Sequence, residues 1–115
     1  MPNKYYRAGR VILVAFLVIG CASVDYVGRS LDPTAHVDVY YSEEEIDREY
    51  TVIGHAIGTG RFLVSNEDIL EELIEDARSR GADAILITGI DKAHVPTDDG
   101  SDEEKQITAS FLKYE

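Results

Sequence analysis

An unbroken apolar run over residues 11–19 constrains the fold most, because it separates the first twenty residues from the rest of the chain. Residues 1–10 carry three basic residues and no acidic one, and the run ends at Gly20-Cys21. A basic segment, a short apolar segment and a small residue are typical of a secretory signal. Nine apolar residues are too few for a helix across a bilayer, which needs about 20. We therefore expect residues 1–20 to be a signal peptide.

The end of this run, Val18-Ile19-Gly20-Cys21, resembles the lipobox of bacterial lipoproteins. In that family the cysteine thiol receives diacylglycerol, the signal is cut before the cysteine, and the new amine takes a fatty acid such as palmitate. The resemblance implies lipidation at Cys21, with Val18, Ile19 and Gly20 as the cleavage motif. The alternative is an incidental cysteine that ends a hydrophobic stretch.

Lipidation implies a location. Three acyl chains exceed the two membrane signals that stable anchoring needs. In enterobacterial lipoproteins an aspartate after the cysteine retains the protein at the inner membrane, so Ala22 favours the outer membrane, with the domain facing the periplasm. The chain has one cysteine, so it forms no internal disulfide, and lipidation leaves it no thiolate.

The charge of the chain limits its partners. Cleavage removes three of the 11 basic residues and none of the 22 acidic ones, which leaves 8 against 22 and a net charge of −14. Such a surface repels phosphate, so we expect no nucleic-acid partner, while cations are attracted.

We predict an α+β domain in residues 36–115, preceded by the lipidated cysteine and a flexible tether in residues 21–35. Hydrophobic patterns predict a small mixed four-stranded sheet with one covering helix, in ββαββ order with a βαβ crossover. The predicted strands are 36–41, 50–57, 82–90 and 106–114, the helix is 66–80, Gly58-Thr59-Gly60 is a flexible turn, and 91–105 is a polar interruption.

The predicted helix is the clearest element. Ser65 is a suitable N-cap with Asp68 as its capping-box partner, and apolar residues from Ile69 to Ala77 recur on one face. Gly81 supplies the left-handed residue that ends a helix.

One helix covers one face of a sheet, so the other face is solvated or used for association. The aromatic residues Tyr40, Tyr41, Tyr50 and Phe111 either complete the core or form an interface, since aromatics are enriched at interface cores.

Three stretches, Val37–Tyr41, Tyr50–Gly54 and Arg80–Leu86, resemble the YbjQ-like and RcsF-like small domains. The resemblance covers residues 36–114. These groups include oligomeric proteins assigned to heavy-metal binding and an outer-membrane stress-sensing lipoprotein. Neither role transfers to this chain, because the sensor relies on disulfides and the metal assignment carries no residue motif that matches here.

Catalytic and metal motifs are weak. His36, His55 and His94 form no close pair, which disfavours a soft-metal site, although one histidine with carboxylates stays open as a site. Residues 98–104 and Glu43–Glu45 are acidic but lack EF-hand spacing, so a solvated loop is preferred to a calcium site. Residues 54–60 match a phosphate loop only faintly, and Ser30, Ser42 and Ser65 lack a nucleophile context.

The sequence therefore favours a lipid-anchored envelope protein without enzymatic activity or cofactor. Its domain would bind or sense an envelope protein partner, or form a homo-oligomer. The alternative is a divalent-cation binding module.

Overall fold

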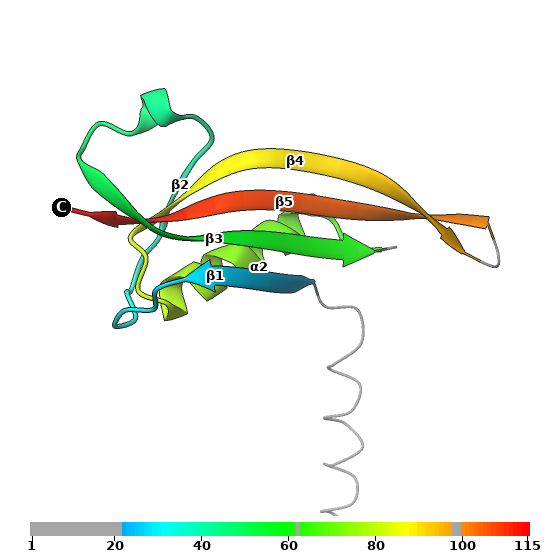
Figure 1. Ribbon diagram of the computed structural model, residues 1–115, viewed down its shortest axis with the longest axis horizontal. Helices are drawn as coiled ribbons and strands as arrows, with labels where there is room; N and C mark the ends of the chain where they lie inside the picture. Colours follow the sequence, from blue (N-terminus) through cyan, green and yellow to red (C-terminus); the bar gives the residue numbers. More distant parts are fainter. Residues whose placement is uncertain (1–21, 62, 98–99) are drawn as a thin grey trace, which may run out of the picture.

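The computed structural model describes residues 22–61, 63–97 and 100–115. Its elements are β1 (Ser23–Gly28), β2 (Asp38–Tyr40), the 3-10 turn η1 (Glu43–Glu45), β3 (Tyr50–Arg61), α2 (Asn66–Ser79), β4 (Ala84–Thr97) and β5 (Gly100–Tyr114). The strands form one sheet in the order β1-β3-β5-β4-β2, and α2 lies behind it in Figure 1. Strands β2 and β4 are parallel, and the other neighbours are antiparallel. The α+β class is confirmed.

The predicted sheet of four strands is wrong by one strand, because part of the expected tether is β1. Ser23 to Gly28 pair with β3 from Thr59 to Gly54. Further along, the amides of Leu31 and Thr34 donate to the carbonyls of Arg80 and Arg78, at 2.8 and 3.0 Å. The end of α2 has carbonyls without partners inside the helix, so this segment satisfies them. Residues 22–34 are thus part of the domain.

The predicted polar interruption at residues 91–105 is also wrong, because most of this segment belongs to strands β4 and β5. Strand β4 continues to Thr97 and β5 begins at Gly100, with pairs from Asp91↔Gln106 to Thr97↔Gly100. Backbone pairing needs no apolar side chains, so a polar two-stranded arm leaves no hydrophobic pattern in the sequence. Figure 1 shows this arm extending beyond the end of β3.

The turn expected at Gly58-Thr59-Gly60 is not present, because these residues lie inside strand β3. Both glycines face α2 and the residues just before it. A Cβ on Gly58 would lie 2.6 Å from Ile69 Cγ2, and one on Gly60 would lie 2.5 Å from Val64 Cγ1. The glycines therefore permit close packing of helix and sheet, which is a role in a strand and not in a turn.

The main core lies between α2 and the sheet. Ile69, Leu73 and Ala77 of the helix are fully buried, as predicted, against buried residues of the three central strands. Ser65 and Asp68 form the predicted capping box, and Gly81 ends the helix at φ +85°. Strands β3 and β4 both run antiparallel to β5, so α2 makes the predicted crossover between parallel strands, which β5 separates.

A smaller apolar cluster occupies the opposite face, under the β2–β3 connection. Ala84, Leu86 and Leu112 are its buried members, and Tyr40, Ile46, Tyr50 and Tyr114 pack against them. Of the four aromatics considered above, Phe111 is buried in the main core, Tyr40 and Tyr50 join the smaller cluster, and Tyr41 is exposed.

Tyr26 connects β1 to the centre of the sheet. Its ring stacks on Phe111 of β5, with centroids 4.8 Å apart, although β3 lies between the two strands. This contact is possible because Gly54 of β3 has no side chain, and a Cβ there would lie 2.4 Å from Tyr26 Cζ. The Arg80 guanidinium lies 4.3 Å from the ring centroid, so the ring also contacts the end of α2.

We predict that Gly54→Ala lowers the free energy of unfolding by about 2 kcal/mol, since the methyl group displaces the Tyr26 ring. The measurement is urea unfolding followed by circular dichroism. Gly89→Ala is the matched control, because its Cβ would meet two side-chain oxygens and no ring, Thr108 Oγ1 at 2.9 Å and Asp91 Oδ2 at 3.8 Å. We expect a smaller loss there, and equal losses in both variants would contradict this account.

Candidate functional site

The predicted lipidation site and its cleavage motif, Val18 to Cys21, lie outside the described residues. Ala22, which follows Cys21 in the sequence, is partly buried and packs against the main core. Strand β1 begins one residue later, at Ser23. Within residues 22–61, 63–97 and 100–115, no helix is long and apolar enough to cross a membrane. The structure thus leaves almost no chain between Cys21 and the folded domain.

The described histidines lie apart from each other. His36 Nε2 lies 2.8 Å from Asp38 Oδ1, and His55 Nδ1 lies 3.2 Å from Ser110 Oγ on the sheet face opposite α2. The side chain of His94 is outside the described part. Across the residues that the structure describes, no three His, Cys, Asp or Glu side chains gather as a metal site would require.

Most residues of the faint phosphate-loop, acidic and serine motifs lie in strands or at the starts of helices. Residues 54–60, compared above with a phosphate loop, belong to β3. Residues 100–104 of the predicted acidic loop belong to β5, while residues 98–99 lie outside the description. Ser65 caps α2, and Ser42 precedes η1, where Glu45 accepts hydrogen bonds from the amides of Tyr41 and Ser42.

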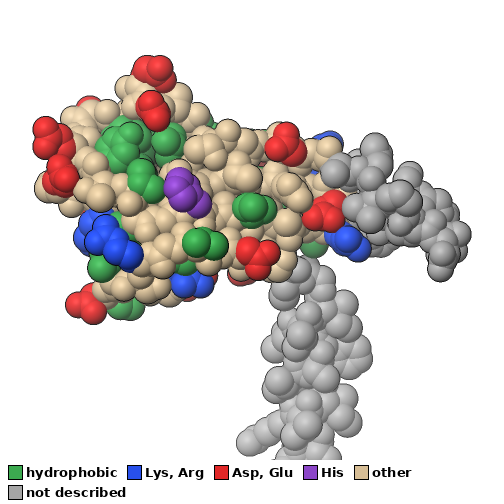
Figure 2. Space-filling view, in the orientation of Figure 1, with side chains coloured by type: hydrophobic (Ala, Val, Ile, Leu, Met, Phe, Trp, Pro, Cys, Tyr) green, Lys and Arg blue, Asp and Glu red, His purple; other side chains and the backbone are tan. Residues whose placement is uncertain are grey.

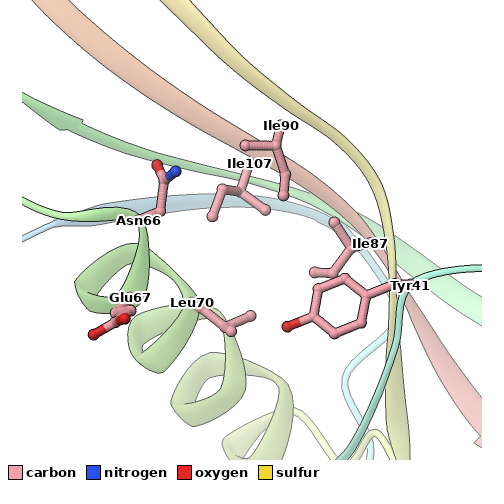
Figure 3. Close-up of a pocket in the computed structure, with 7 residues that line it drawn as sticks. All are labelled: Tyr41, Asn66, Glu67, Leu70, Ile87, Ile90 and Ile107. Carbon is pink, nitrogen blue, oxygen red and sulfur yellow. The ribbon is translucent and has the colours of Figure 1, made fainter.

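Sequence reasoning missed an apolar groove between the first turns of α2 and the edge of the sheet (Figure 3). Its volume is about 150 Å³. The lining residues come from the β2–β3 connection, α2, β4 and β5, and are Tyr41, Asn66, Glu67, Leu70, Ile87, Ile90 and Ile107. Two of them are exposed apolar residues, Tyr41 at 58% and Ile90 at 52%. Exposed apolar side chains at a hollow are typical of a binding surface.

A bulge in β4 builds one wall of this groove. The pairing of β4 with β5 shifts by one residue between Ile87 and Gly89. Side chains of a regular strand alternate between faces, so residues three apart would lie on opposite sides of the sheet. The extra residue brings Ile87 and Ile90 to the same face, toward α2, as Figure 3 shows. The sequence predicted residues 82–90 as one strand and gave no indication of this shift.

The sheet face opposite α2 also carries exposed apolar residues, Val27, Val52 and Ile57. Figure 2 views the molecule from this side and shows hydrophobic side chains in separate groups, with acidic side chains toward the rim. Asp25 and His55 lie among the apolar residues of this face, since Asp25 pairs with Ile57 and Val27 pairs with His55.

A hydrogen-bonded cluster joins β2 to the end of β5. The Tyr114 hydroxyl donates to Asp38 Oδ2 at 2.5 Å, and the Tyr40 hydroxyl lies 2.8 Å from that of Tyr114. The hydrogen bond from Tyr114, followed by that from His36, lowers the pKa of the Asp38 carboxyl. Burial, together with the bonds to Asp38 and Tyr40, raises the pKa of the Tyr114 hydroxyl. The Arg48 guanidinium lies 3.8 Å from the Tyr114 ring centroid.

Comparison with known proteins gives a likeness of fold. Neither the family models nor the curated proteins compared with the sequence match it. The crystal structure of a Francisella virulence factor, FvfA, in the orthorhombic form is similar, with a TM-score of 0.53. The two chains are 17% identical, and the similarity covers 78% of this chain and 97% of that chain. At this identity the similarity describes the fold alone.

We predict that Asp38→Asn lowers stability by about 1 kcal/mol at neutral pH, a low value for a charged hydrogen bond because the carboxyl is partly exposed. Folding lowers the Asp38 pKa, so its contribution is present above the unfolded value of 3.8 and fades as the pH falls below it. The measurement is urea unfolding of both proteins from pH 6 to pH 3. Asp47→Asn, in the exposed connection, is the control, and a wild-type advantage as large at pH 3 as at pH 6 would contradict the assignment.

Proposed function

We propose that this chain is the precursor of a lipid-anchored protein of the bacterial envelope, without enzymatic activity, whose domain binds a protein partner or associates with itself. The observation that carries the proposal is Val18-Ile19-Gly20-Cys21 after a basic segment and nine apolar residues. By the same resemblance, Ala22 favours the outer membrane with the domain on the periplasmic side.

The folded part supports a binding role through its surface. The groove at the start of α2 places exposed Tyr41 and Ile90 beside Leu70, in a hollow that no described residue fills. The opposite sheet face adds separate exposed apolar residues. Apolar side chains that a folded domain exposes to solvent are typical of surfaces that bind other proteins. The YbjQ-like and RcsF-like resemblance is part of the same proposal.

We expect Cys21→Ala to move the chain from the membrane fraction to the soluble fraction, with at least a tenfold loss of membrane-bound protein. The variant loses the thiol that would carry the lipid. The measurement is fractionation of bacterial cells followed by immunoblotting, and mass spectrometry of the wild type should show the acylated cysteine. Ser23→Ala, two residues further on, is the matched control. Membrane retention of Cys21→Ala would refute the anchor.

A second candidate, a divalent-cation binding module, is motivated by the net charge of −14 after cleavage. Under the leading proposal, calorimetric titration of the purified chain with calcium, zinc and copper gives no saturable binding below about millimolar metal, since weak surface carboxylates do not form a closed ligand set. A saturable site with micromolar affinity would favour the cation module. The oligomeric state, measured by light scattering on the same sample, separates self-association from partner binding.

A further inference from the structure

The edge of β4 changes character where β2 ends. Strand β2 pairs with β4 over three residues only, from Asp38↔Ala84 to Tyr40↔Leu86. From Ile87 to Asp91, β4 pairs with β5 on one side, and no strand in the described part of the chain lies on its other side. In an antiparallel pair alternate residues direct N–H and C=O groups away from the partner strand. This stretch is therefore an open hydrogen-bonding edge in line with β2.

The apolar groove lies directly beside this open edge. Ile87 and Ile90 belong both to the edge and to the groove lining, and Leu70 of α2 faces them (Figure 3). A strand placed next to β4 would direct every second side chain toward α2, and so into the groove. The volume of about 150 Å³ matches an engineered apolar cavity that takes benzene, so it holds one large apolar side chain.

We infer that the edge from Ile87 to Asp91 and the adjoining groove together bind an extended segment of another protein, which adds to the sheet as a strand in line with β2. The backbone of the segment would pair with β4, and one leucine-sized or phenylalanine-sized side chain would fill the groove. Addition of a strand to a sheet edge gives affinity through the backbone and specificity through pockets for alternate side chains.

Charge selects the chemistry of the segment. Glu67 lines the groove and is exposed, and Asp91 at the end of the open edge is exposed as well. The chain carries a net charge of −11, so a second copy meets like charge. The fitting occupant is therefore a segment with lysine or arginine on either side of its apolar anchor.

This inference rests on the proposed function only in that the domain binds a protein partner, and it does not require a lipid on Cys21. Failure of the anchor would appear in the fractionation of Cys21→Ala. Failure of the groove would appear in peptide binding to the purified chain, so the two failures are distinguishable.

The test is selection of a displayed library of nine-residue peptides on the full chain, purified in detergent micelles. We expect enriched peptides with a large apolar residue at the centre and basic residues near both ends. A synthetic peptide from the enriched set should bind Ile90→Lys at least tenfold more weakly than the wild type. Val27→Lys adds the same charge at an exposed apolar residue of β1, and it should change affinity less than twofold.

Backbone methylation tests the strand geometry. N-methyl groups on the alternate peptide residues that face β4 should abolish binding, while the same groups on the other residues should leave it within threefold. Absence of any enriched peptide, equal affinity for Ile90→Lys and wild type, or equal effects of the two methylation patterns would each overturn the inference.

Discussion

The Tyr26 ring packs strand β1 against the central strand β5 and the end of helix α2, and the place of β1 in the fold depends on this contact. It extends from β1 across Gly54, stacks on Phe111 and receives Arg80 on its other side. Arg80 in turn pairs with Asp76 of α2 at 2.7 Å. A glycine in the middle of a strand destabilises the sheet unless an aromatic ring packs over it. Here the ring over Gly54 is that of Tyr26, from an edge strand. Strand β1, the central strand and the helix end are thus one packing unit.

This arrangement makes the two sheet edges unequal. On the β1 side, β1 pairs with β3 over six residues, and the segment after it donates backbone hydrogen bonds to carbonyls at the end of α2. On the β4 side, β2 covers three residues and then leaves the sheet. Natural sheets often protect such edges with bulges. Here the bulge at Thr88 also turns Ile87 and Ile90 to one face, so the feature that interrupts the edge also shapes the groove.

The sequence predicted best what depends on local apolar periodicity. The helix, its Ser65 cap and its Gly81 end follow from spacing and capping chemistry, and the structure has all three. The β1 strand escaped prediction because only Val24 and Tyr26 mark its inner face. The groove could not be foreseen, since it depends on a one-residue register shift between β4 and β5, and register is a property of two strands paired across the sheet.

The short link before β1 has a consequence for the partners a membrane-anchored copy could meet. A long flexible linker lets a binding domain search many heights, whereas a short stiff one gives a high effective concentration at one height and almost none elsewhere. Ala22 already packs against the core, so the link offers no slack. If a lipid on Cys21 held the chain at the bilayer, the domain would select targets by their distance from the membrane as well as by their sequence.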